Sequence, residues 1–70
     1  MTPERLRSLR AALGVTQDSL ARALGVTPTA VAHWEAGHRR PSGPARRLLT
    51  LLEQGAIDLA ALRRAAREDE

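Results

Sequence analysis

The stretch TQDSLARALGVTPTAVAHWEAG, from Thr16 to Gly37, decides how this chain folds. It contains two short helical patterns that are separated by only a few residues. Gly25 follows the first pattern, at a position where a helix ends with positive φ and where glycine carries no Cβ penalty. Thr27 is suited to cap a second helix. Pro28 fits the first position of that helix, because the N–H that proline lacks has no helical partner there anyway.

The side chains of this stretch suit two helices that cross closely. Ala21 lies midway along the first helical pattern, where a small side chain lets a second helix approach. The apolar contacts between the two helices are expected from Leu20, Leu24, Val26, Val31 and Trp34. The spacing therefore predicts a helix-turn-helix, the motif whose second helix enters the major groove of DNA.

Over the whole chain, capping and periodicity signals predict five helices and no strand. We expect these helices at about 3–13, 17–24, 28–36, 43–54 and 58–67, with N-caps at Thr2, Thr16, Thr27, Ser42 and Asp58. Residues 1–67 then form a single domain, and residues 68–70 form a frayed acidic tail. The chain has 70 residues and no cysteine, so its stability must come from helix packing. The predicted fold is an all-α, compact five-helix bundle.

The charge pattern has two readings. All eleven basic residues are arginine, and residues 1–67 hold all of them against five of the eight acidic residues. A basic body suits a polyanionic partner, because arginine forms forked contacts to phosphate. The alternative is that arginine reflects a coding bias and solvates the helix faces.

Several classes of protein are excluded by what the sequence lacks. No apolar run approaches the ~20 residues of a membrane helix, and the N-terminus has no apolar region of a signal peptide. We therefore expect a cytoplasmic, nucleoid-associated protein. The sequence offers no credible nucleophile, carboxylate pair or glycine-rich phosphate loop, so we expect no enzyme and no cofactor. The set His33, Glu35 and His38 is spread over different faces and a helix break, so we expect no metal site.

The order and spacing of residues in this chain resemble those of a known protein family. The run from Leu13 to Glu53 resembles the DNA-binding domain of the phage-repressor and Cro superfamily, the Xre-type helix-turn-helix. Its markers are Gln17, Ala21, Gly25, Val31, Trp34-Glu35-x-Gly37 and Arg40-Pro41-Ser42. The resemblance covers roughly Arg5 to Glu53. It implies a repressor-like five-helix fold and double-stranded DNA as partner, with a two-fold dimer on a near-palindromic operator.

The resemblance implies that the third helix reads bases with Thr27, Pro28, Thr29 and His33. Helical periodicity agrees, because it places Val31 and Trp34 inward and the residues around His33 outward. The two threonines offer a hydroxyl and a methyl group, and the histidine offers one donor and one acceptor. Pro28 cannot donate. We therefore expect modest direct readout of bases and a larger contribution from DNA shape.

Contacts to the DNA backbone are expected at either side of this helix. The resemblance implies that Gln17 donates to a phosphate from the start of the second helix, where the helix dipole favours an anion. The alternative for Gln17 is an ordinary first-turn polar residue. We further expect phosphate or minor-groove contacts from His38, Arg39, Arg40, Ser42 and Arg46, each of which is alternatively a solvated surface residue.

Two residues of the third helix are expected to be structural. Trp34 is the only aromatic residue in the sequence apart from histidine, and its helical phase puts it on the Val31 side, in the core. Glu35 would repel DNA phosphate if it faced outward. The resemblance implies that it turns inward to hold the first two helices or the loop, with Arg10 as an ion-pair partner.

The fifth helix leaves two readings open. Ile57, Leu59, Leu62 and Ala66 form a short apolar stripe that we interpret as a dimer interface. Alternatively, the stripe covers the leucine-rich fourth helix of its own chain.

The predicted function is a sequence-specific DNA-binding transcriptional regulator, a repressor that acts as a homodimer. The alternative is an antitoxin-like interaction module that binds a protein partner, a toxin or regulator, as well as its own promoter.

Overall fold

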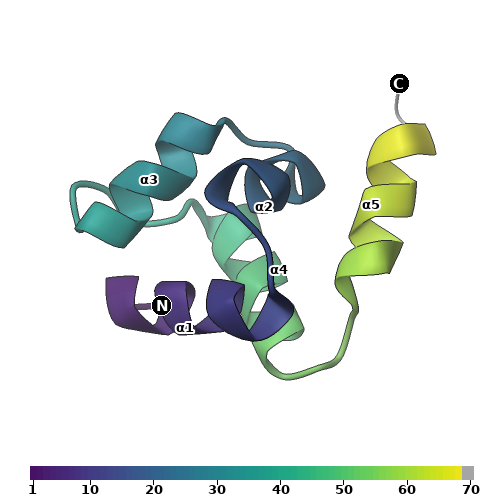
Figure 1. The fold of residues 1–70 in the computed structure, drawn as a ribbon, viewed down its shortest axis with the longest axis horizontal. Coiled ribbons are helices and arrows are strands. Elements are labelled where there is room, and N and C mark those ends of the chain that lie inside the picture. Colours follow the sequence, from purple (N-terminus) through teal and green to yellow (C-terminus); the bar gives the residue numbers. More distant parts are fainter. Residues whose placement is uncertain (69–70) are drawn as a thin grey trace.

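The computed structural model describes residues 1–68 and contains five α-helices in that range, with no strand. The helices are α1 (Pro3–Leu13), α2 (Gln17–Leu24), α3 (Pro28–Ala36), α4 (Gly43–Glu53) and α5 (Leu59–Glu68) (Figure 1). The predicted all-α, five-helix fold is confirmed. The predicted bounds differ by one residue at the end of α4 and at both ends of α5. Of the predicted frayed tail, Glu68 closes α5, and the last two residues lie outside the described residues.

Side-chain caps start four of the helices at the predicted residues. The cap oxygens of Thr2, Thr16, Thr27 and Asp58 accept hydrogen bonds from backbone N–H groups three residues later, at 3.1, 3.0, 3.1 and 2.7 Å. Ser42 also occupies an N-cap position, but its side chain makes no capping hydrogen bond, so the prediction of a Ser42 cap is right in position only. Pro44 in the first turn supplies the fixed helical φ that starts α4 without it.

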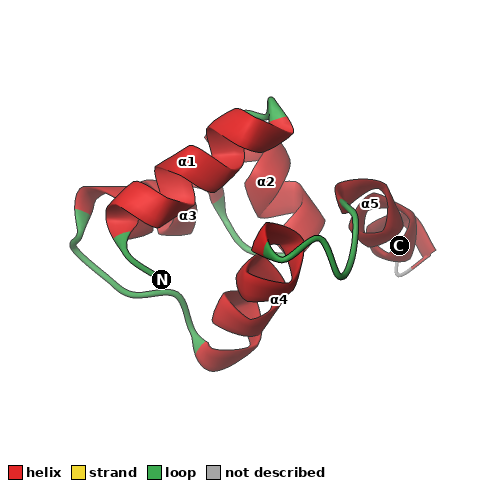
Figure 2. Cartoon of the chain, turned by 90° about the horizontal axis from the view of Figure 1, so that it is seen from below, coloured by secondary structure: helices red, strands yellow, loops and turns green. Residues whose placement is uncertain are grey.

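The first four helices enclose one apolar core, to which α5 adds Leu59. α3 packs against α2 and α1, and α1 packs against α4 (Figures 1 and 2). The buried apolar side chains are Leu6, Leu9, Leu20, Ala21, Ala23, Val31, Trp34, Ala45, Leu49, Leu52 and Leu59. Arg5 of α1 and Glu53 of α4 form an ion pair that links these two helices at the surface. Among the described helices, none is both long and apolar enough to cross a membrane.

α5 lies at the edge of the molecule, beyond α2 (Figure 1). Leu59 is buried, and Ile57 and Leu62 are partly buried against the core. These three of the four stripe residues therefore pack within their own chain. Its principal neighbour is α2, whereas the alternative reading expected α4. Ala23 on α2 is small and buried, which gives α5 room to approach that helix.

Candidate nucleic-acid interface

The turn between α2 and α3 holds the two helices close together. α2 ends at Leu24, and Gly25 adopts the left-handed conformation at φ 76°. This reversal lets the N–H of Val26 bond the carbonyl oxygen of Ala21 at 3.0 Å. Thr27 then caps α3 through the N–H of Ala30. Only three residues separate the helices, and two of them, Gly25 and Thr27, have the capping roles that the sequence predicts.

The inward side of α3 is built from apolar side chains and one carboxylate. Val31 is fully buried, and Trp34 is 6% exposed, so the predicted core position of the tryptophan is confirmed. Ala21 of α2 is also fully buried, as expected for a small residue at a close helix crossing. The third buried residue of α3 is Glu35, the only buried polar or charged residue in the described part of the chain.

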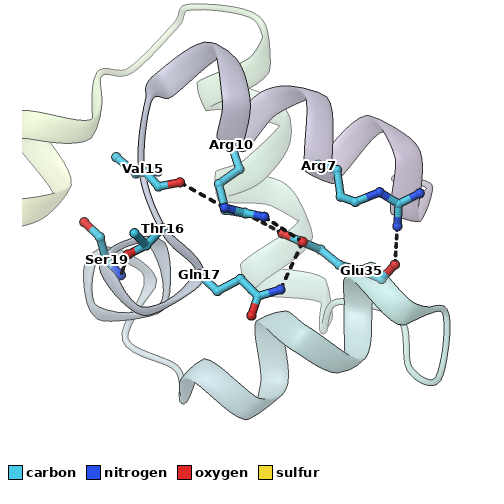
Figure 3. Close-up of polar contacts among 7 residues, drawn as sticks. All are labelled: Arg7, Arg10, Val15, Thr16, Gln17, Ser19 and Glu35. Carbon is cyan, nitrogen blue, oxygen red and sulfur yellow. Dashed lines mark hydrogen bonds and ion pairs between the residues drawn. The ribbon is translucent and has the colours of Figure 1, made fainter.

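Glu35 is held from both neighbouring helices (Figure 3). Arg10 of α1 donates from Nε to Oε2 at 2.7 Å and from Nη2 to Oε1 at 3.0 Å. Gln17, the first residue of α2, donates from Nε2 to Oε1 at 3.1 Å. Arg7 of α1 donates to the backbone carbonyl oxygen of Glu35. The ion pair with Arg10 therefore forms, and it is one part of a wider network that joins α1, α2 and α3.

This network also sets the protonation of the carboxyl group. The hydrogen bonds from Arg10 hold the pKa of Glu35 below its ordinary value, although burial opposes this effect. The amide of Gln17 and the charges of the two arginines lower the pKa further. Glu35 is thus a buried anion whose acceptor atoms point at α1 and α2, away from the outer side of α3.

The outer side of α3 borders a shallow hollow. Thr27 and Thr29 are exposed and His33 is half-buried. The hollow, of about 360 Å³, lies between α3 and the segment that leads to α4, and is lined by Thr27, Thr29, Ala30, His33, Trp34, Arg39, Arg40 and Ser42. Three of the residues predicted to read bases are thus brought together with three of those predicted to contact the DNA backbone. Pro28 is exposed at the start of α3, outside this lining.

The other predicted contact residues lie around the hollow. Arg46 of α4 lines a second hollow of about 500 Å³ together with Arg39 and Arg40, next to the first residues of α1. His38 is exposed, and its ring lies against that of His33. Gln17 is half-buried, and its amide is bonded to Glu35, a contact that the sequence analysis did not foresee.

A third group of polar residues was not singled out as a site by the sequence analysis. The Nη2 group of Arg63 on α5 donates to the Oγ atom of Ser19 on α2 at 2.7 Å. A groove of about 620 Å³ between these helices is lined by Ser19, Arg22, Ala23, Arg63, Ala66 and Arg67. Arg63 and Arg67 are four residues apart, so the sequence could have shown that they share one face of α5. No local pattern indicates that this face lies against α2.

A comparison with known families bears on this geometry. A family model described as helix-turn-helix matches residues 6–45, from α1 into the first turn of α4. The match covers more than half of the chain and includes the turn, the Glu35 network and the hollow beside α3. No curated protein and no solved structure matches the chain.

Proposed function

The chain belongs to the helix-turn-helix family of the Cro and C1 type, and from this premise we propose that it represses transcription by occupying a specific operator. Membership makes it a DNA-binding regulator whose ligand is double-stranded DNA. We place the whole activity in one domain, residues 1–67. The activity needs neither catalysis nor a cofactor, and it takes place on the nucleoid.

The hollow beside α3 is the observation that carries the proposal. Its α3 side presents short polar groups from Thr27, Thr29 and His33, which suit base edges and the methyl group of thymine. Its other side presents Arg39 and Arg40, which suit the phosphates that border a groove. We propose that α3 enters the major groove and that the segment before α4 rests on the adjacent strand.

Gln17 supports the same orientation from α2. Its amide nitrogen carries two hydrogen atoms, and the bond to Glu35 uses one of them. We propose that the second donates to a phosphate at the start of α2, where the free N–H groups also favour an anion. In this arrangement Glu35 orients the donor. We assign further phosphate contacts to His38, Ser42 and Arg46.

We propose a symmetric dimer on a near-palindromic operator. Two α3 helices would then enter successive major grooves, about 34 Å apart. The predicted dimer residues Leu59 and Leu62 are engaged within their own chain, and residues 1–68 expose no large hydrophobic side chain. We therefore propose that pairing of two copies depends on the DNA. Sedimentation with and without operator tests this: a dimer of equal stability without DNA contradicts it.

Selection of binding sites from random duplexes, followed by a salt titration, tests the function itself. We expect a recovered site with two-fold symmetry. We also expect a steep loss of affinity with salt, because each neutralised phosphate releases counterions. A protein that shows no salt-dependent binding to the selected pool or to genomic DNA would rule out the proposal.

The groove between α2 and α5 favours a protein partner as a second candidate function. Three of the six residues that line it are arginines, and it lies away from the hollow beside α3. An acidic polypeptide, a toxin or another regulator, suits such a surface. Stoichiometric co-purification that is lost in the Arg67→Glu variant, with DNA binding retained, supports this function. Co-purification that survives the substitution contradicts it.

A further inference from the structure

His33 and His38 form a pair of imidazoles at the edge of the proposed DNA-contacting surface. Their ring centroids are 5.8 Å apart, and the ring planes stand at 82° to each other. His33 lines the hollow beside α3, and His38 is exposed two residues after α3 ends. They are the only histidines in the chain.

The end of α3 builds this pair. Gly37 adopts φ 80°, which turns the chain back on the helix. The N–H of His38 then bonds the carbonyl oxygen of His33 at 2.9 Å, and the N–H of Arg39 reaches the same oxygen at 3.4 Å. The helix cap thus brings the two residues next to each other, and their rings meet edge to face.

The charges around the pair are positive. The hollow that His33 lines contains Arg39 and Arg40 as its charged side chains. From α1, Arg7 reaches the carbonyl oxygen of Glu35 at the end of α3. The Glu35 carboxylate faces Arg10 and Gln17 instead. Within residues 1–68, neither histidine has a carboxylate partner.

We propose that this pair couples DNA binding to proton uptake, so that affinity for the operator rises as the pH falls through the neutral range. The inference rests on the proposed function. Both rings lie on a surface whose charged side chains are arginines, with no carboxylate partner among residues 1–68. A phosphate brought to the same surface supplies the missing negative charge. The protonated pair is therefore favoured in the complex, and by linkage protons favour the complex.

The same coupling alters what His33 can read. A neutral imidazole offers one donor and one acceptor, whereas an imidazolium offers two donors. A protonated His33 has no acceptor for the amino group of adenine. At low pH it therefore suits guanine, which shows two acceptors in the major groove, better than adenine, which shows one acceptor and one donor. Sites selected at the two ends of the pH range are expected to differ at the base that His33 faces.

Binding measured as a function of pH tests the proposal. The probe is a fluorescent duplex of the selected operator, titrated at constant ionic strength from about pH 8 to about pH 6. We expect the affinity of the unaltered protein to rise roughly tenfold or more over this range. Calorimetry in buffers of different ionisation enthalpy is expected to show uptake of about one to two protons per bound chain near neutrality.

Three variants assign the effect. His38→Gln and His33→Gln are each expected to reduce the pH dependence, and the variant with both changes is expected to abolish it. Arg40→Gln is the matched control, because it removes a permanent positive charge from the same hollow. This variant should weaken binding equally at every pH.

The outcomes separate this inference from the proposed function. Salt-dependent operator binding that does not change with pH overturns the proton coupling and leaves the DNA-binding function intact. A pH dependence that persists in the double histidine variant also overturns it, because another group then titrates. Absence of salt-dependent DNA binding at every pH overturns the proposed function itself.

Discussion

The inner and outer sides of α3 differ in how fully their side chains are engaged. On the inner side, Val31 and Trp34 are packed into the core, and every carboxylate oxygen of Glu35 accepts a hydrogen bond. On the outer side, Thr29 is exposed and His33 is half-buried beside an open hollow. One nine-residue helix therefore carries an inner face whose side chains are fully engaged and an outer face that borders an open hollow.

This difference teaches how a short helix is held in one orientation. Apolar burial stabilises α3 but has little directional preference, since it depends mainly on the area removed from water. The hydrogen bonds of Glu35 are directional, and they come from two different helices. They fix the rotation of α3 about its axis, and hence which residues face outward.

Loss of the tryptophan should produce the largest effect on the inner side. Trp34→Ala leaves a large void in a small core and should lower the free energy of unfolding by about 3–5 kcal/mol. Denaturant unfolding followed by circular dichroism measures this. DNA binding should be lost together with the fold. A change below about 1 kcal/mol would mean that this side chain is not a core residue.

Loss of the buried carboxylate should have the next largest effect. Glu35→Gln keeps the shape but leaves the Arg10 guanidinium without its anion, and should lower the free energy of unfolding by about 1–3 kcal/mol. Glu53→Gln is the matched control, because it makes the same change in the exposed pair with Arg5. It should cost much less, since exposed pairs are well solvated. Equal losses in the two variants would refute the special role of Glu35.

The acid sensitivity of the fold should reveal the same residue. The pKa of Glu35 is lowered in the folded protein, chiefly by Arg10. Its stabilising contribution is therefore complete above the ordinary carboxyl pKa of about 4.3, and is lost as the pH falls below that value through the folded pKa. We expect unfolding free energies measured across this range to fall less steeply for Glu35→Gln than for the unaltered protein. Parallel curves would count against this assignment.

Substitution on the outer side should have the smallest effect on stability. His33→Ala removes a half-buried side chain that faces the hollow, so the midpoint of thermal unfolding should hardly change. Operator binding should nevertheless weaken, or the protein should tolerate more bases at the contacted position. The discrimination between the right and the wrong base there should fall by about 1–3 kcal/mol at most. If this variant instead melts like Trp34→Ala, the two sides of α3 have been assigned the wrong way round.

The elements that sequence reasoning located are those specified by local chemistry. The threonine caps, the glycine at the α2–α3 turn and the apolar spacing of α3 each act within about one helical turn. They were sufficient to give the helix bounds to within one residue, and the inward position of Trp34. The family resemblance added the pairing of Glu35 with Arg10, which no local pattern indicates.

Contacts between side chains that are far apart in the sequence were harder to predict from the sequence. Gln17 was assigned a phosphate contact, and its bond to Glu35 was not foreseen, because that bond depends on how α2 and α3 cross. One local prediction also failed, because Ser42 occupies the N-cap position but α4 forms without a capping bond from its side chain. The contact roles proposed for the hollow rest on its geometry and on the family, and they remain predictions.

By itself, the sequence determined that this chain forms five helices, that a tight turn joins the second to the third, and which side of the third is apolar. Helix periodicity and capping act between neighbouring residues, so they can be read along the chain. Only the tertiary structure decided that Gln17 joins Arg10 in binding Glu35, and that α5 rests on α2. These contacts join residues from different helices, and they exist only once packing has fixed the angles between those helices.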